Sequence, residues 1–209
     1  LCDNLGVLTE LERQDIPYTR IAPTRELERS SAVIVDDDRA VRDMVHHLWA
    51  LGHRRIGFIT GNVAHFSAHR RRAAFLDEMD KLADAGASYA VEQGNFSFES
   101  GIDAGGKLLD AQDRPTAIFA SNDEMAAGVI AAAMMRGLSL PADLSVCGFD
   151  DSPIARCTWP PLTTIYQPLG QMASAAIGHL LGDPDRHILR HLELKLIERG
   201  STAAPRAST

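Results

Sequence analysis

A regular alternation of short apolar stretches and longer amphipathic segments constrains the fold of this chain more than any other feature. Apolar stretches that predict strands recur at residues 32–35, 55–60, 89–91, 117–120 and 144–149. A helical segment with one apolar face separates each of them from the next, and the loops are short. Strands that alternate with helices in this way form a parallel sheet covered by helices on both faces. The sequence therefore predicts an α/β fold.

The segments at the two ends of the chain extend this pattern. Asn4 or Asp3 is expected to cap a first helix, and residues 18–22 are expected to form a short strand. A short strand is also expected at residues 163–166, and Pro168 begins a helix that ends near Leu181. Residues 191–198 alternate apolar and charged side chains, which predicts a single edge strand with one buried face.

Composition excludes several classes of protein. The 209 residues carry a formal net charge of -7, which argues against a surface that grips a nucleic acid backbone. The three cysteines show no metal-binding or redox spacing, as expected for a protein of the reducing cytoplasm. The most apolar run, residues 125–135, is too short to span a bilayer. Because the chain begins at Leu1 without a signal peptide, we expect it to be part of a longer cytoplasmic protein.

Polar side chains follow the predicted strands at the edge where an open parallel sheet binds its ligands. These side chains belong to Ser67 and the basic run at residues 69–72, to Ser121, Asn122 and Asp123, to Asp150 and Asp151, and to Gln167. Carboxylates, amides and a guanidinium group together bind hydroxyl groups. The aromatic rings of Phe96 and Phe98 follow another strand, and an aromatic face packs well on a sugar ring.

Structural roles compete with these functional ones. Asn122 or Asp123 can cap the following helix, and capping is the favoured role for Asp123. The acidic run at residues 36–38 is likewise expected to cap a helix. Phe96 and Phe98 are equally consistent with core packing. No nucleophile elbow, zinc-protease, Walker or dinucleotide motif is present, and consecutive Asp150 and Asp151 side chains should diverge. The sequence therefore predicts neither an enzyme nor a metal or cofactor site.

Three blocks of sequence resemble the effector-binding core of the LacI/GalR family of transcriptional regulators. They are "LGHRRIGFITG", "SAHRRRAAF" and "PTAIFASNDEMAAGVIAAAMMRGLSLPADLSVCGFDDSPIARCTWPPLTTIYQP". The resemblance implies a periplasmic-binding-protein-like fold with two Rossmann-like parallel-sheet lobes joined by crossover strands. An incomplete N-terminal lobe would comprise residues 1–36 and 167–189, and the C-terminal lobe residues 37–166 and 190–205. The helix-turn-helix of the family would lie outside this chain.

The same resemblance implies the residues of an effector site and of a dimer interface. The effector contacts of the family fall on Asp150, Asn122, Arg71, Ser67, Phe96 and Gln167. The interface falls on Met125, Thr158 and Trp159, although a tryptophan beside two prolines is also consistent with core packing. Ala22-Pro23 stands where many relatives carry an acid, which removes one expected contact to a ligand hydroxyl.

The function implied by the resemblance is that of a cytoplasmic sensor. A small-molecule effector, a carbohydrate or related polyol, would control a homodimeric or larger repressor by allostery, and the missing N-terminal domain would bind operator DNA. The alternative is a periplasmic sugar-binding receptor of a transporter, which has the same fold. The "PPLTT…QP" block, the free cysteines and the absent signal peptide disfavour this alternative. An enzyme on this fold is a third hypothesis that no catalytic motif supports.

Overall fold

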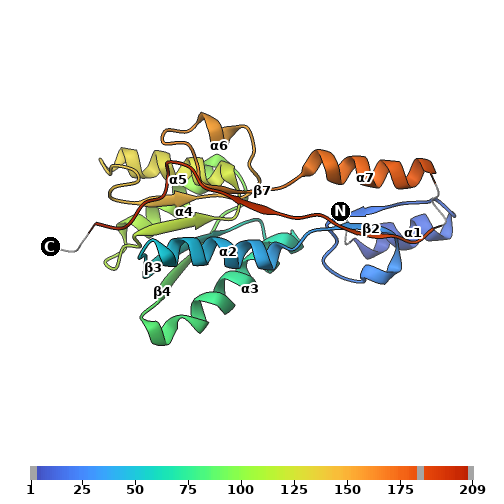
Figure 1. Cartoon of the computed structure of the whole chain (residues 1–209), viewed down its shortest axis with the longest axis horizontal. Coiled ribbons are helices and arrows are strands. Elements are labelled where there is room, and N and C mark those ends of the chain that lie inside the picture. The colour runs from blue at the N-terminus through green and yellow to red at the C-terminus, as the bar shows by residue number, and fades with distance from the viewer. Residues whose placement is uncertain (1–3, 183–185, 207–209) are drawn as a thin grey trace. The chain divides into compact units, whose positions relative to one another are not determined.

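The computed structural model divides into two compact units, and it describes residues 4–182 and 186–206 (Figure 1). Unit 1 contains Leu1–Asp36 and Pro168–Leu194, and unit 2 contains Asp37–Gln167 and Lys195–Thr209. Strands and helices alternate as predicted, and both units contain a parallel sheet. The predicted α/β class is confirmed.

The main sheet of unit 2 has four parallel strands in the order β4-β3-β5-β6. Its strands are β3 (Arg55–Thr60), β4 (Ser88–Gln93), β5 (Ala117–Ala120) and β6 (Ser145–Cys147). An antiparallel pair, β7 (Thr164–Tyr166) and β9 (Lys195–Ile197), continues this sheet through parallel bridges from Cys147 to Thr163 and from Asp150 to Tyr166.

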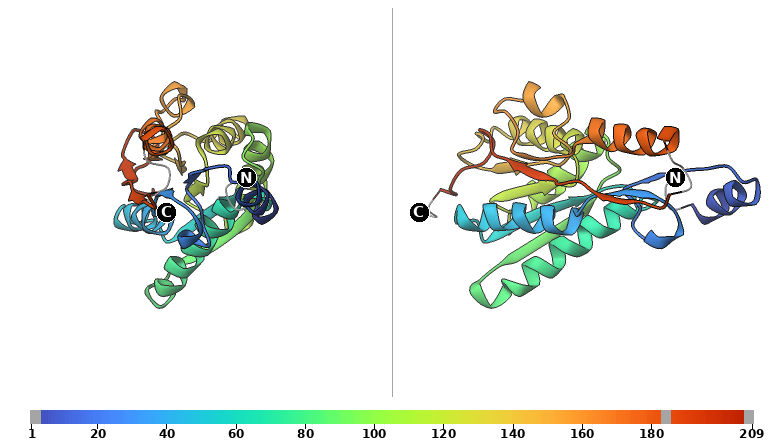
Figure 2. Two further views of the ribbon diagram at one scale, coloured as in Figure 1. Left: turned by 90° about the vertical axis from the view of Figure 1, so that its right-hand side faces the viewer. Right: turned by 45° about the vertical axis from the view of Figure 1, so that its right-hand side comes forward.

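Helices cover both faces of this sheet. They are α2 (Asp37–Ala50), α3 (Phe66–Lys81), α4 (Phe98–Asp110), α5 (Asp123–Met135) and the short α6 (Ile154–Cys157). The chain crosses from β3 to β4 in one direction and from β4 through β5 to β6 in the other. Because parallel crossovers are right-handed, this order places α3 on one face and α4 and α5 on the other (Figures 1 and 2).

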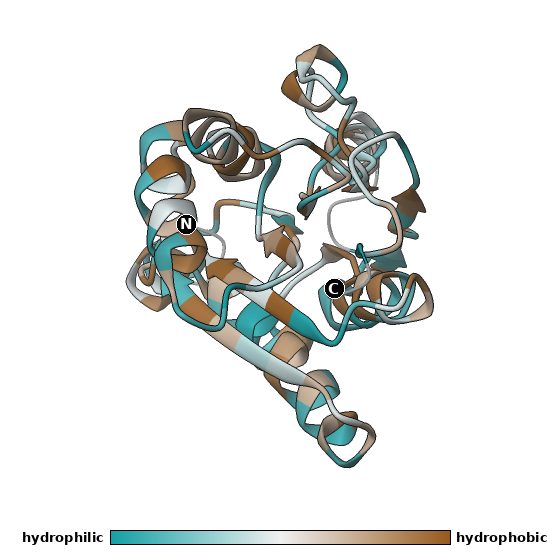
Figure 3. Cartoon of the chain, turned by 90° about the vertical axis from the view of Figure 1, so that its left-hand side faces the viewer, coloured by the Kyte–Doolittle hydropathy of each residue, from teal (hydrophilic) through white to brown (hydrophobic). Residues whose placement is uncertain are grey.

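The core of unit 2 is packed by large side chains of the sheet and by small residues between helices. Phe58 of β3 stacks on Phe75 of α3 at 4.5 Å between ring centroids and meets Phe119 of β5 edge to face. Apolar residues gather on the strands and on one side of the surrounding helices (Figure 3). A Cβ at Gly128 of α5 would lie 2.2 Å from the carbonyl oxygen of Phe98. Only glycine therefore allows α4 and α5 to approach this closely.

Unit 1 is smaller. Its parallel sheet has the order β1-β2-β8, with β1 at Arg20–Ile21, β2 at Ala32–Ile34 and β8 at Leu189–His191. The helix α7 (Leu169–Gly182) contributes Met172 and Ala176 to a core with Val33 and Val35. The other helix, α1 (Leu5–Arg13), begins after Asn4, whose side chain accepts a hydrogen bond from the amide of Val7.

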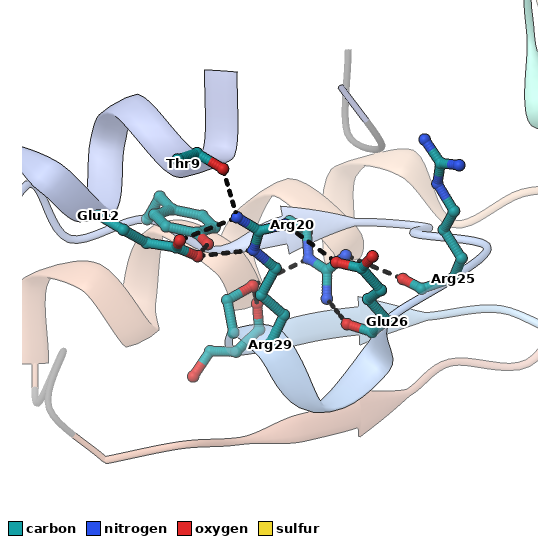
Figure 4. A network of polar contacts seen from close by, with 9 residues as sticks. Thr9, Glu12, Arg20, Arg25, Glu26 and Arg29 are labelled. Carbon is teal, nitrogen blue, oxygen red and sulfur yellow. Dashed lines mark hydrogen bonds and ion pairs between the residues drawn. The ribbon is translucent and has the colours of Figure 1, made fainter. Parts of the chain in front are cut away.

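A polar network fastens α1 to the loop that follows β1 (Figure 4). Arg29, in the 3-10 turn Leu27–Arg29, donates to Glu12 at 2.7 and 2.9 Å and to the hydroxyl of Thr9 at 2.8 Å. Arg20 donates to the carbonyl oxygens of Arg25 and Glu26 (Figure 4). Hydrogen bonds to Arg29 and Tyr18 lower the pKa of Glu12 to about 2. The network thus joins α1 to the loop that follows β1.

One predicted element is wrong. The alternating residues 191–198 do not form one strand, because β8 ends at His191 and β9 begins at Lys195. β8 pairs with β2 in unit 1, whereas β9 pairs with β7 in unit 2. Alternation reports which side chains are buried but not which backbone supplies the hydrogen bonds, so it does not reveal a change of sheet.

Candidate functional site

Arg71 is the centre of a polar cluster at the carboxyl edge of the unit 2 sheet. It lies on α3, and its side chain is 7% exposed. Its Nε donates to Oδ1 of Asp37 at 2.8 Å, and one terminal nitrogen donates to the carbonyl oxygen of Ser121 at 2.7 Å. The guanidinium carbon lies 3.5 Å from the ring centroid of Phe149. Contacts from three directions therefore fix the position and the plane of this guanidinium group.

Asp150 lies next to this guanidinium group, just beyond β6. Its Oδ1 accepts a hydrogen bond from Nε2 of Gln167 at 2.5 Å and lies 3.8 Å from a terminal nitrogen of Arg71. Burial raises the pKa of the Asp150 carboxyl, whereas Arg71 and Gln167 oppose that rise. The backbone φ of Asp150 is 115°, an unusual value for a residue other than glycine. Such conformations persist where the surrounding structure holds a side chain in a required direction.

Asn122 is the N-cap of α5. Its Oδ1 accepts from the amide of Met125 at 3.0 Å, and its Nδ2 donates to the carbonyl oxygen of Phe96 at 3.0 Å. The prediction that Asp123 caps this helix is wrong. Asn122 has the extended backbone that a cap requires, with φ -155° and ψ 168°, whereas Asp123 is already the first helical residue.

Asp123 is instead a buried acceptor. It receives hydrogen bonds from the hydroxyl of Thr164 at 2.5 Å and from the amide of Ser152 at 2.7 Å. Burial raises the pKa of its carboxyl to about 6, against the effect of these hydrogen bonds. Its two partners lie on β7 and in the loop before α6, so Asp123 joins segments that border the cluster.

Two further candidates lie around the cluster. Ser67 is on α3 one helical turn before Arg71, a spacing that places both residues on one face. Phe96 is partly buried and packs against the core, with its ring 5.6 Å from that of His65. It also covers Gly61, where a Cβ would lie 1.9 Å from the Phe96 ring. Contacts connect Arg71, Asp150 and Gln167 with one another, and Asn122 with Phe96.

Two residues of the cluster were not identified from the sequence, because Asp37 was assigned to helix capping and Phe149 to a core strand. Ser121 was noted only as one of the polar residues that follow a predicted strand. The hydroxyl of Ser121 is buried and has no hydrogen-bond partner within the part of the chain that the structure describes.

The residues expected at a subunit interface differ in exposure. Trp159 is 82% exposed, and the adjacent Thr158 donates to the carbonyl oxygen of Pro160 at 3.0 Å. Trp159 is therefore not part of the core of this chain. Met125 is completely buried in the core of unit 2, beside Gly94 and Gly101. This burial corrects the expectation of a Met125 contact with a partner subunit, because the face of α5 that carries Met125 packs against α4 and the sheet.

The cluster combines donors and acceptors that suit a ligand with several hydroxyl groups. A carboxylate accepts hydrogen bonds from hydroxyl groups, and the remaining N–H groups of Arg71 donate to their oxygens. Within residues 4–182 and 186–206, no three His, Cys, Asp or Glu side chains converge as metal ligands do. No helix in those residues is both long and apolar enough to cross a membrane.

Comparison with known proteins places this chain in a family. The periplasmic binding protein-like domain family matches residues 45–202. An uncharacterised HTH-type transcriptional regulator of Streptomyces limosus is 39% identical over 200 residues, which is 92% of this chain and 56% of that protein. Other curated relatives, among them repressors, are also HTH-type transcriptional regulators. The chain spans about half the length of the curated relatives it matches.

Solved structures of similar fold are also transcriptional regulators. The dimeric Lac repressor with an 11-residue C-terminal deletion is 28% identical with a TM-score of 0.85, over 96% of this chain and 74% of that one. A LacI family transcriptional regulator from Enterococcus faecium with bound ribose is 25% identical with a TM-score of 0.83, over 97% and 76%. These relatives are regulators, which favours that class over a transport receptor. The chain therefore belongs to the periplasmic binding protein-like domain family, in the form found in LacI-type transcriptional regulators.

Proposed function

We propose that this chain is the effector-sensing and dimerisation domain of a LacI-type repressor that works in the cytoplasm. Its family and the regulator names of its relatives support this proposal. Operator DNA would be bound by a helix-turn-helix domain outside this chain, and the effector would change the affinity for that DNA. We propose a sensor without catalytic activity, cofactor or metal.

The observation that carries the proposal is the convergence of Arg71, Asp150 and Gln167 at the carboxyl edge of a parallel sheet. We propose that Asp150 accepts hydrogen bonds from the effector and that Arg71 and Gln167 donate to it. Phe96 would pack on an apolar face of the ligand, while Ser67 and the second amide N–H of Asn122 would add contacts. This chemistry supports a carbohydrate or related polyol as the effector.

Calorimetry on the full-length protein tests this site. A panel of pentoses, hexoses and disaccharides is first screened by thermal shift, since a bound ligand raises the apparent stability. Asp150→Ala is expected to weaken the binding of the sugar so found by at least about tenfold, because a hydrogen bond to a charged group is lost.

The matched control is Asp143→Ala, which removes a carboxylate that pairs with Arg206. Its affinity for the sugar should equal that of the wild type. Unchanged affinity in Asp150→Ala would refute the assignment of the site. If no sugar alters the affinity of the full-length protein for its operator, the proposal of a carbohydrate sensor fails.

We also propose that the two units correspond to the two lobes of the family. Residues 1–36 and 167–189 would belong to an N-terminal lobe whose other part lies outside this chain, except that Gln167 belongs to unit 2. Residues 37–166 and 190–205 would form the C-terminal lobe, except that β8 pairs within unit 1 and moves its residues to the first lobe. Trp159 and Thr158 would contact a second subunit, because the Trp159 side chain is exposed.

A further inference from the structure

Two of the three nitrogens of the Arg71 guanidinium group already donate within unit 2. A guanidinium group binds a phosphate or carboxylate best when two N–H groups of one edge point at the anion in parallel. The Nε of Arg71 donates to Asp37, and a terminal nitrogen donates to the carbonyl oxygen of Ser121. The edge that carries Nε has thus given one N–H group to Asp37, and one of the two N–H groups of Nη1 is given to Ser121. The remaining N–H groups can still donate singly, as a hydroxyl oxygen requires.

The charge around Arg71 also disfavours an anion. Two carboxylates, Asp37 and Asp150, face this one guanidinium group at 2.8 and 3.8 Å. Asp37 and Arg71 are both nearly inaccessible to water, with side chains 5% and 7% exposed. Water therefore screens this pair little, and an approaching anion would meet the uncompensated charge of Asp150.

A neighbouring ion pair between the same two helices is more exposed than the Asp37–Arg71 pair. Asp38 and Arg70 also join α2 to α3, at 2.9 Å, but their side chains are 39% and 31% exposed. The two pairs carry the same charges on the same two helices. They differ in that the Asp37–Arg71 pair belongs to the polar cluster, whereas Asp38 and Arg70 border the groove between α2 and α3.

From this geometry we infer that Asp37 determines the class of effector, by holding Arg71 away from oxyanion recognition. The part of the effector that contacts unit 2 then carries uncharged hydroxyl groups, and a phosphorylated group is rejected there. Asp37 acts through Arg71 and is a positioning residue. The inference rests on the proposed function, because it names the chemical class that the same site accepts.

Inorganic phosphate is a direct probe of this inference, because it needs no knowledge of the natural effector. Sodium phosphate is titrated into the full-length protein by calorimetry, against sodium chloride of matched ionic strength. The wild type and Asp38→Asn are expected to bind phosphate with equal, weak affinity. Asp37→Asn keeps the side-chain shape but removes one charge and should strengthen phosphate binding at least about tenfold. Adding Arg71→Ala to that variant should abolish the gain.

The outcomes separate this inference from the proposed function. Submillimolar phosphate binding by the wild type that Arg71→Ala abolishes would overturn the inference without any need for the Asp37 variant to fold. An Asp37→Asn protein that gains no phosphate affinity over Asp38→Asn would also overturn it. The affinity for ribose 5-phosphate relative to that for ribose should be higher in Asp37→Asn than in the wild type. Operator binding that responds to inorganic phosphate in the wild type, and no longer does so in Arg71→Ala, would refute the inference and leave the regulator function standing.

Discussion

Asp123 is a carboxylate with no exposed surface, and its hydrogen-bond partners come from segments far along the chain. Burial disfavours its charged form more than two hydrogen bonds favour it, so the pKa of the carboxyl rises to about 6. The folded protein therefore keeps a proton on Asp123 over a range of pH in which the unfolded chain has lost it. Folding is coupled to pH at this one residue.

Replacing Asp123 tests this coupling. The folded state holds its proton from about pH 4 to about pH 6, so the stability contributed by the protonated form is lost as the pH rises through that window. The free energy of unfolding of the wild type, relative to that of Asp123→Asn, should fall by up to about 3 kcal/mol between pH 4 and pH 7. Urea denaturation across this range measures it, with the exposed Asp84→Asn as the control. A pH-independent difference would refute the coupling.

The same scale separates Asp150 from Asp151, two consecutive acids with different partners. Asp151 forms ion pairs with Arg199 at 2.6 Å and Arg156 at 3.0 Å, whereas Asp150 faces Arg71 and Gln167. Their side chains diverge, as predicted for consecutive residues at a strand end. Asp151 therefore ties α6 to the segment after β9, and Asp150 alone belongs to the cluster.

At the scale of elements, α4 and α5 cross at a distance that only glycine permits. A Cβ at Gly101 or at Gly128 would lie 2.2 Å from a backbone oxygen of the other helix. Gly178 of α7 offers a contrast, because nothing lies within 4 Å of the Cβ that it would carry. The same substitution should therefore have opposite effects on the two helices.

Gly128→Ala should lower the free energy of unfolding by about 1–3 kcal/mol, because α4 and α5 must move apart. Gly178→Ala, in a helix interior with free space, should raise it by about 0.5–1 kcal/mol. Chemical denaturation of both variants measures the pair. Equal effects of the two substitutions would show that helix propensity, and not close approach, governs these positions.

His53 lies just before β3 at the amino end of the unit 2 sheet. Its ring contacts the starts of β5 and β6 and the C-terminal segment. Its Nδ1 lies 2.9 Å from the hydroxyl of Thr116, and its Nε2 lies 3.0 Å from that of Ser145 and 2.9 Å from the carbonyl oxygen of Ala203. Because a carbonyl oxygen only accepts, Nε2 carries a proton and the neutral ring satisfies these partners. Burial lowers the pKa of His53, and the charges of His47 and Arg54 lower it further.

A lowered histidine pKa makes the fold sensitive to acid. Below about pH 6.5 the unfolded chain binds a proton that folded His53 does not, so stability falls as the pH decreases, by at most about 1.4 kcal/mol per pH unit from this group. His53→Gln should remove that part of the slope between pH 7.5 and 5.5 in urea denaturation. His69→Gln, on an exposed face of α3, serves as the control. A slope that His53→Gln leaves unchanged would contradict this assignment.

For the whole molecule, the two units differ in the size of their cores. All four residues of β5 are buried between neighbouring strands and covering helices. Among the residues that the structure describes, every fully buried aromatic ring lies in unit 2. In unit 1, the cluster beside α7 consists of Val33, Val35, Met172 and Ala176. Less buried apolar surface therefore surrounds the backbone hydrogen bonds of the unit 1 sheet than those of the unit 2 sheet.

Amide hydrogen exchange should reflect this difference. We expect the amides of β2 to exchange at least about tenfold faster than those of β5, because less buried apolar surface opposes local opening in unit 1. Mass spectrometry of peptides that contain each strand makes the measurement on this chain. Equal protection of the two strands would show that both units open only by global unfolding.

The proposed dimer is also a property of the whole molecule. Trp159→Asp should weaken self-association of the full-length protein by at least about tenfold, because a charge replaces a large apolar contact at an interface. Val63, which is 63% exposed in the same unit, provides the control as Val63→Asp. Analytical ultracentrifugation over a concentration series distinguishes the two variants. A Trp159→Asp protein that dimerises as well as the Val63 variant would remove Trp159 from the interface.

The sequence by itself determined the order of strands and helices, the α/β class and the residues that follow each strand. These features depend on local periods, on helix ends and on a parallel topology that brings strand ends to one edge. It could not determine that Asn122 caps α5 while Asp123 is buried, because adjacent polar residues are equally suited to either role. It also could not show that residues 189–197 divide between two sheets, since the alternation of side chains carries no information on which strand pairs with which.

Only the tertiary structure decided what surrounds each side chain. The pairing of Asp37 with Arg71 joins positions that are 34 residues apart, and the burial of Met125 depends on how closely α4 approaches α5. Such contacts arise from packing across elements, where a shift of a few ångströms changes which atoms meet. The polar residues at the strand ends were therefore apparent from the sequence, whereas their ion pairs and hydrogen-bond partners were set by the fold.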